Sequence, residues 1–202
     1  MTEIAPSIPI GRLLRSSTDS FTFGCSIPEP DVPLFGAFVK APAQQDHAEV
    51  IGLIYNIIIE DDLFVRQMIA TPDLPESYIL DQRKNRKVPI EVSVLSVGYK
   101  KGGELFHMLP PQPPITLDHI RQCTPDEITT FTEGFGYLRL VLNARDVPTD
   151  ELLASSLHQA IYVRPVEERQ YYLLEAGREL ARLLSNDLTR LETLLNCVKG
   201  TT

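Results

Sequence analysis

The stretch EVIGLIYNIIIED, residues Glu49–Asp61, carries apolar side chains on both faces of an extended chain. Successive residues of a β-strand point to opposite sides of the sheet, so alternate residues share a face. The two expected faces consist of Val50, Ile54 and Ile58 on one side and Ile51, Leu53, Tyr55, Ile57 and Ile59 on the other. A strand that is apolar on both sides is covered on both sides. The sequence therefore predicts the central strand of a barrel here, with further structure packed outside it.

Shorter strands are predicted around this one. They are Gly11–Arg15, Ser20–Ser26, Phe35–Lys40 and the two strands of a hairpin over residues 89–109. The hairpin turns at Lys100–Gly103, and the proline-rich segment PPQPPIT, residues 110–116, ends the sheet. A closed barrel leaves no exposed sheet edge. We therefore expect an α+β protein in which residues 1–114 form a small six-stranded antiparallel β-barrel.

The following residues change to helical patterns. Thr124–Glu127 has the signature of a capping box, with Thr as the cap, Pro at the first helical position and Glu three residues after the cap. Phe135–Asn143 is expected to return as a strand, and Thr149 is expected to cap a second helix. Residues 115–163 are thus predicted to be a connector with short helices and one strand.

The third predicted segment, residues 164–202, is dominated by one long amphipathic helix from Pro165 to Val198. Its apolar positions recur every three or four residues, which is the spacing of one helix face. The stripe predicted to form an oligomer or partner interface contains Leu173, Leu180, Leu184, Leu188, Leu191 and Leu195. Such a helix spans roughly 50 Å. One small barrel cannot cover that length, so part of the stripe is expected to contact a protein partner or a second copy of the chain.

The charge balance bears on the kind of partner. The net charge is −8, whereas proteins that bind a phosphate backbone usually present a basic face. The basic cluster of the sequence is Arg83, Lys84, Arg86 and Lys87. Most basic runs of this kind are solvated loops without a function of their own. The alternative is that this cluster contacts nucleic acid or an acidic partner. Nucleic acid is the less favoured partner.

The cysteines and the apolar runs indicate a cytoplasmic protein. Cys25, Cys123 and Cys197 are scattered and form no C-x-x-C pair, as expected for reduced thiols. The first residues lack the features of a signal peptide. No run approaches the roughly 18 apolar residues that span a bilayer, so membrane insertion is not expected.

Candidates for chemistry are sparse. His119 and Cys123 are four residues apart, and His107 is nearby in sequence, but a zinc site needs three or four converging ligands. We therefore favour the interpretation that His119 is an ordinary polar residue and Cys123 a half-buried thiol. Cys25 has no recognisable His or Asp partner that would make it a nucleophile. The run Glu60–Asp62 is better explained as helix capping than as a cation site. No metal, cofactor or catalytic set is predicted.

Several segments resemble the HAS-barrel, the domain shared by HerA-type ATPases and the amino-terminal crown of ATP-synthase catalytic subunits. The segments are IGRLLRSSTDSFTF (10–23), FGAFVK (35–40), VIGLIYNIII (50–59), MLPPQPPITL (108–117) and YLRLVLNARDVPTDELLASSL (137–157). The resemblance covers roughly Ile8–Ala160 and implies a barrel that helps to organise an assembly.

The ATPase activity of that family is not implied, because the phosphate-binding pattern G-x-x-x-x-G-K-[ST] is missing from the sequence. Gly102-Gly103 is followed by Glu-Leu-Phe, which fits a hairpin turn. We therefore predict a non-catalytic adaptor or assembly module that acts through its barrel and its terminal helix. The alternative is an accessory factor of nucleic-acid processing that binds nucleic acid or a HerA-like complex through the Arg83–Lys87 loop.

Overall fold

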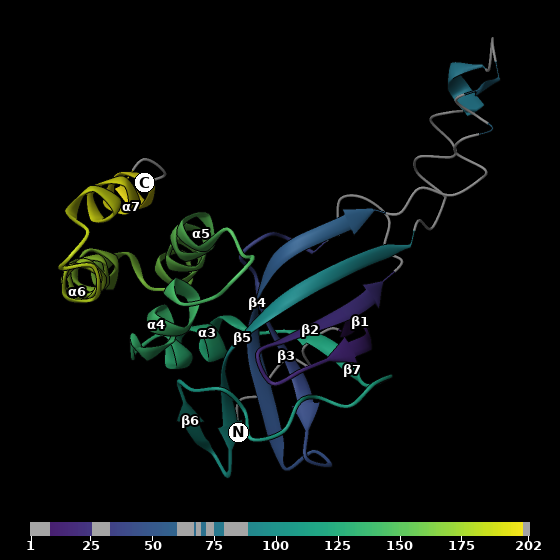
Figure 1. The fold of residues 1–202 in the computed structure, drawn as a ribbon, viewed down its shortest axis with the longest axis horizontal. Helices are drawn as coiled ribbons and strands as arrows, with labels where there is room; N and C mark the ends of the chain where they lie inside the picture. The colour runs from purple at the N-terminus through teal and green to yellow at the C-terminus, as the bar shows by residue number, and fades with distance from the viewer. Residues whose placement is uncertain are drawn as a thin grey trace.

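Strands come first along the chain and helices follow. The computed structural model describes residues 9–25, 33–59, 67, 70, 71, 75–78 and 89–199. The strands are β1 (Pro9–Ser16), β2 (Ser20–Cys25), β3 (Phe38–Ala43), β4 (Ala48–Ile59), β5 (Ile90–Lys101), β6 (Glu104–Phe106) and β7 (His119–Gln122). The later helices are α3 (Pro125–Phe131), α4 (Gly136–Leu142), α5 (Thr149–Tyr162), α6 (Val166–Leu183) and α7 (Leu188–Lys199). In Figure 1 these helices lie on one side of the strands, with α6 and α7 farthest from β1.

The strands close into a barrel. Their order is β2-β1-β7-β3-β4-β5, and β2 pairs with β5 to complete the ring, while β6 adds a seventh strand beside β5. All pairings within the ring are antiparallel. The predicted α+β class and six-stranded antiparallel barrel are confirmed. The sixth strand of the ring is β7, which follows the predicted boundary at residue 114, whereas β6, the second strand of the predicted hairpin, lies outside the ring.

The strand β4 separates two apolar cores, as its two apolar faces predict. Val50 and Ile54 belong to the cluster that fills the barrel. Ile51 and Leu53 belong to the cluster under the helices. The helices therefore cover the outside of β4, which is the structure that the sequence required on that side.

The prediction was wrong for the end of β4. A register shift between Ile54 and Asn56 in the pairing with β5 changes which side the following residues face. Ile57 consequently packs with the barrel interior and not with Ile51, while Ile58 and Ile59 are exposed.

The capping box predicted at the start of α3 is present, and it also attaches the helix to the barrel. The Glu127 backbone N–H donates to Thr124 Oγ1 at 3.3 Å, and the Thr124 backbone N–H donates to Glu127 Oε2 at 2.9 Å. The other carboxylate oxygen of Glu127 accepts from Lys40 Nζ on β3 at 2.5 Å. One side chain therefore caps α3 and holds it against the sheet.

The strand predicted at Phe135–Asn143 is a helix, α4. Its buried residues are Tyr137, Leu138 and Val141, which share one helix face. The barrel ring is already complete without this segment, so closure does not require it as a strand. Thr149 was also misassigned, because the cap of α5 is Pro148 and Thr149 is the first helical residue.

The long helix predicted from Pro165 to Val198 is two helices. The first begins directly after Pro165, as predicted, but α6 ends at Leu183 and α7 begins at Leu188. Asp187 Oδ1 accepts the backbone N–H of Arg190 at 3.0 Å and so caps α7. The chain reversal between the helices allows Leu194 to reach the same core as α5, which a continuous rod would not.

Candidate protein-interaction surface

The predicted basic cluster cannot be assigned from the structure. Arg83, Lys84, Arg86 and Lys87 lie outside the described residues, as does the run Glu60–Asp62. The contact proposed for the basic cluster therefore stays a prediction.

The predicted leucine stripe is divided by the break between α6 and α7. Leu180 and Leu184 are buried in the core, so these two side chains are not available to a partner. Leu173, Leu191 and Leu195 are partly buried against the same core. Leu188 is the exposed member of the set, at 69%.

A different set of apolar residues is exposed on α6. Val166 is 70% exposed, Tyr171 69% and Leu174 53%, while the side of α6 that packs inward carries Tyr172, Ala176 and Leu180. The predicted stripe followed a single spacing of three or four residues from Leu173 to Leu195, and this spacing leaves out Val166, Tyr171 and Leu174.

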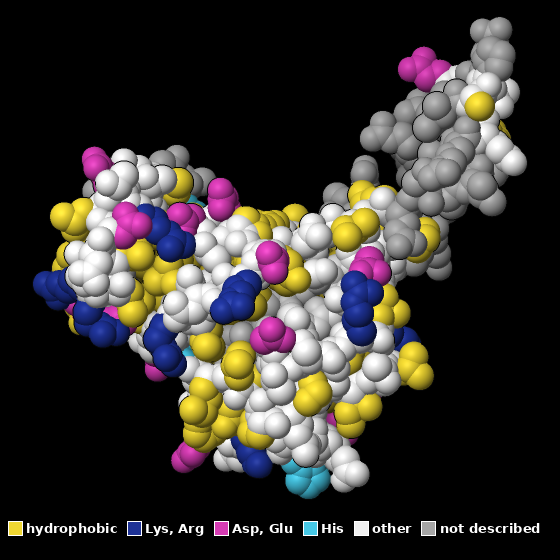
Figure 2. Space-filling view, viewed as in Figure 1, with side chains coloured by type: hydrophobic (Ala, Val, Ile, Leu, Met, Phe, Trp, Pro, Cys, Tyr) yellow, Lys and Arg dark blue, Asp and Glu magenta, His cyan; other side chains and the backbone are white. Residues whose placement is uncertain are grey.

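A hollow of about 740 Å³ lies beside this stripe. Its apolar lining comes from both terminal helices: Tyr171, Leu173, Leu174, Gly177 and Ala181 of α6 with Leu195 and Val198 of α7. Polar groups stand at its edge, with Glu167 towards one end of α6 and Arg178 towards the other. We call Val166, Gln170, Tyr171, Leu174, Gly177 and Ala181 the α6 surface. Figure 2 shows hydrophobic side chains exposed on the lobe that α6 and α7 form.

A second hollow, of about 700 Å³, continues the apolar region from α6 to α5. It contains Tyr162 and Val166, and it shares Gln170 and Leu173 with the first hollow. The side chain of Tyr162 is 79% exposed. The apolar region therefore extends over three helices and is not limited to single scattered side chains.

Charged groups fix the helices that carry this surface. Arg190 of α7 binds Asp150 of α5 through Nε at 2.8 Å and Nη2 at 2.6 Å, and its Nη2 also donates to Thr149 Oγ1 at 2.7 Å. Arg164 is 5% exposed and stacks over the ring of Tyr172 in α6, 3.8 Å from its centroid. Because α6 and α7 are each held from the inward side, their outward side is preformed.

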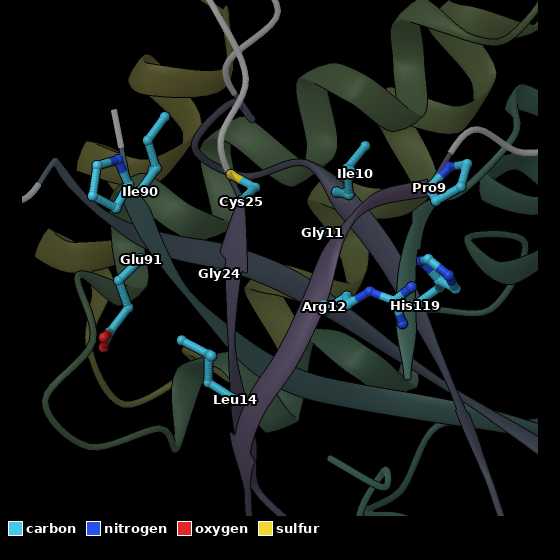
Figure 3. Close-up of a pocket in the computed structure, with 11 residues that line it drawn as sticks. Pro9, Ile10, Gly11, Arg12, Leu14, Gly24, Cys25, Ile90, Glu91 and His119 are labelled. Carbon is cyan, nitrogen blue, oxygen red and sulfur yellow. The ribbon is translucent and has the colours of Figure 1, made fainter. Parts of the chain in front are cut away.

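A pocket of about 710 Å³ lies where β1 begins, β2 ends and β5 begins (Figure 3). Arg12 lies opposite His119 on β7, and the two side chains point towards each other, while Cys25 lies with Ile10 at the other end of the pocket. Arg12 Nη1 already donates to the Leu117 carbonyl at 3.0 Å.

Burial raises the pKa of the Cys25 thiol, which favours the protonated, weakly nucleophilic form. The neighbouring acid, Glu91, is engaged by Arg15. These contacts do not place a base next to the Cys25 thiol. The polar side chains of Arg12 and Glu91 in the pocket already have partners, Leu117 and Arg15.

The three residues considered as metal ligands are not gathered at one point. His107 Nε2 is hydrogen-bonded to the Phe131 carbonyl at 2.8 Å, whereas His119 is exposed on β7 and Cys123 is buried. Burial raises the pKa of the Cys123 thiol far above its ordinary value. Within the described ranges, no group of three or more His, Cys, Asp or Glu side chains is placed to hold a metal ion.

No known protein-family model matches this sequence, and no curated protein matches it either. Within the part of the chain that the structure describes, none of the helices has the length and apolar character needed to cross a bilayer. The resemblance of Ile8–Ala160 to the HAS-barrel therefore stays a prediction.

Proposed function

We propose that this protein is a non-catalytic assembly module that binds a protein chain through the α6 surface. The observation that supports this function is the exposure of Val166, Tyr171 and Leu174 beside an apolar hollow on a rigidly held helix. Removing apolar area from water contributes about 25 cal/mol per Å². Contiguous exposed apolar patches on otherwise polar proteins commonly mark interaction sites.

The chemistry of the surface suits a protein partner. Tyr171 and Leu174 line the hollow together with the polar side chains of Glu167, Gln170 and Arg178. Interfaces between proteins likewise combine aromatic and aliphatic side chains with polar ones. The polar side chains would orient the partner, while the apolar side chains would supply most of the binding free energy.

The barrel would act as the rigid base of the module. The resemblance to the HAS-barrel supports this role, since that domain helps to organise assemblies. Cys25, Cys123 and Cys197 form no disulfide within the described part of the chain, which supports action in a reducing compartment such as the cytoplasm.

The test is retention of proteins from an extract of the native host by the immobilised full-length chain. A double variant, Tyr171→Glu with Leu174→Glu, places carboxylates on the α6 surface and should abolish the retention of a specific protein. Leu188→Glu is the matched control, because Leu188 is equally exposed at 69% but does not line the hollow. The function is rejected if the same proteins are retained by the wild type, the double variant and the control.

A further inference from the structure

We propose that the partner at the α6 surface is the α6 surface of a second copy of this chain, packed antiparallel about a two-fold axis beside Leu174. This inference rests on the proposed function that the surface binds a protein, and it identifies the partner.

The apolar side of α6 is wider than its own fold requires. At about 100° per residue, the inward residues Tyr172, Ala176 and Leu180 occupy one sector, and Val166, Leu174 and Tyr171 extend the apolar sector well beyond it. The polar side holds Glu168, Glu175, Glu179 and Arg182, with Glu167 and Arg178 next to Tyr171. The exposed side chains of Val166 and Leu174 lie outside the sector that the rest of the chain covers.

Gly177 is not explained by packing within the chain. A β-carbon at this position would meet Leu195 Cδ2 at 3.8 Å, an ordinary van der Waals contact, so an alanine fits without displacement. Glycine inside a helix is less stable than alanine. The residue does leave a hollow on the outward side of α6, which is what close approach of another helix requires.

The same surface contains a side chain that fits this hollow. In an antiparallel pair centred on Leu174, residues equally distant from the centre face each other, so Tyr171 of one copy faces Gly177 of the other. Leu174 then contacts Leu174 across the axis. Tyr171 is 69% exposed and thus free to enter the hollow of a second copy. A surface that carries both the projection and the hollow is self-complementary, as a two-fold interface must be.

The charges select the antiparallel arrangement. Glu167 lies near the start of α6 and Arg178 three turns later, both at the edge of the hollow. A parallel pair would place Glu167 beside Glu167 and Arg178 beside Arg178. The antiparallel pair instead places Gln170 opposite Arg178 and brings Glu167 within one turn of the partner's Arg178. It also aligns the two helix dipoles favourably.

Sedimentation velocity of the full-length chain over a range of concentrations tests the association. We expect a monomer–dimer equilibrium. Leu174→Glu places two carboxylates at the axis, and Gly177→Leu fills both hollows, so each should raise the dimer dissociation constant at least about 100-fold. Leu188→Glu should leave that constant unchanged.

Cysteine cross-linking tests the orientation in a background with Cys25→Ser and Cys197→Ser. Mixed chains carrying Gln170→Cys and Arg178→Cys should form a disulfide between unlike chains. Gln170→Cys alone should give little cross-linking, whereas a strong cross-link between its own copies would show a parallel pair and overturn the proposal.

A wild-type chain that stays monomeric at all concentrations also overturns the proposal. That result is separable from failure of the proposed function, because retention of a different host protein through Tyr171 and Leu174 would still support a protein-binding module. Loss of both the dimer and the specific retention would reject the two together.

Discussion

Glu127 provides the sharpest test of how the barrel and the helices are joined. It caps α3 through the Thr124 backbone and binds Lys40 of β3, whose side chain is 13% exposed. Glutamine can keep the cap but not the charge, whereas alanine loses both. The charge-assisted bond is worth roughly 1.5–3 kcal/mol and the cap about 1 kcal/mol. We therefore expect Glu127→Gln to lower the free energy of unfolding by about 2 kcal/mol and Glu127→Ala by about 3 kcal/mol.

The dependence on pH follows from the same contacts. Burial of Glu127 opposes its ionisation, but the hydrogen bonds from Lys40 and from the Thr124 backbone outweigh burial and hold the pKa of Glu127 below its ordinary value. The stabilisation is therefore complete above the pKa of the unfolded state and is lost as the pH falls through the lower, folded-state pKa. The difference between wild type and Glu127→Gln should shrink towards zero in acid.

Urea denaturation followed by circular dichroism at neutral and acidic pH measures both effects. The double variant Lys40→Met with Glu127→Gln is the control, because removing the cation also removes the cost of leaving it half-buried, and part of the stability should return. Equal stability of Glu127→Gln and the wild type at neutral pH, or a difference in stability that does not depend on pH, would contradict the role given to this carboxylate.

Three further substitutions are expected to change stability in opposite directions. Gly177→Ala should raise the free energy of unfolding of the monomer by about 0.5–1 kcal/mol, measured by urea denaturation at low protein concentration, because the new β-carbon meets Leu195 without a clash. Leu194→Ala should lower it by about 2–5 kcal/mol and speed amide hydrogen exchange in α7, because Leu194 is fully buried; unchanged exchange would contradict its place in the core. Gly52→Ala should lower the melting temperature, because its β-carbon would lie 2.4 Å from Val94 Cγ1; an unchanged melting temperature would show that the barrel relaxes there.

The candidate interaction surface was only partly predictable. The sequence indicated that the final segment is amphipathic and available for association, but the leucines chosen for contact include Leu180 and Leu184, which are buried. The exposed residues Tyr171 and Leu174 stand one position away from inward-facing residues on the same helix. Apolar residues on α6 cover more of the helix surface than the core contacts. The spacing of these residues in the sequence does not tell which of them face the core and which face solvent.

Two elements of the fold could be predicted from local signals in the sequence. The two apolar faces of β4 required cover on both sides, and the Thr124–Glu127 box marked the start of α3. Both signals act within a few residues, through side-chain alternation in one case and backbone capping in the other.

Other features depend on segments that are distant in the sequence. The barrel closes without residues 135–143, which form the helix α4 and bury Tyr137, Leu138 and Val141. The register shift in β4 turned Ile57 inward. The reversal between α6 and α7 brought Leu194 into the core, and this packing left Tyr171 and Leu174 exposed. The physical reason is that a helix or strand buries the face that a neighbour can cover, and which neighbour is present is settled only when the whole chain has folded.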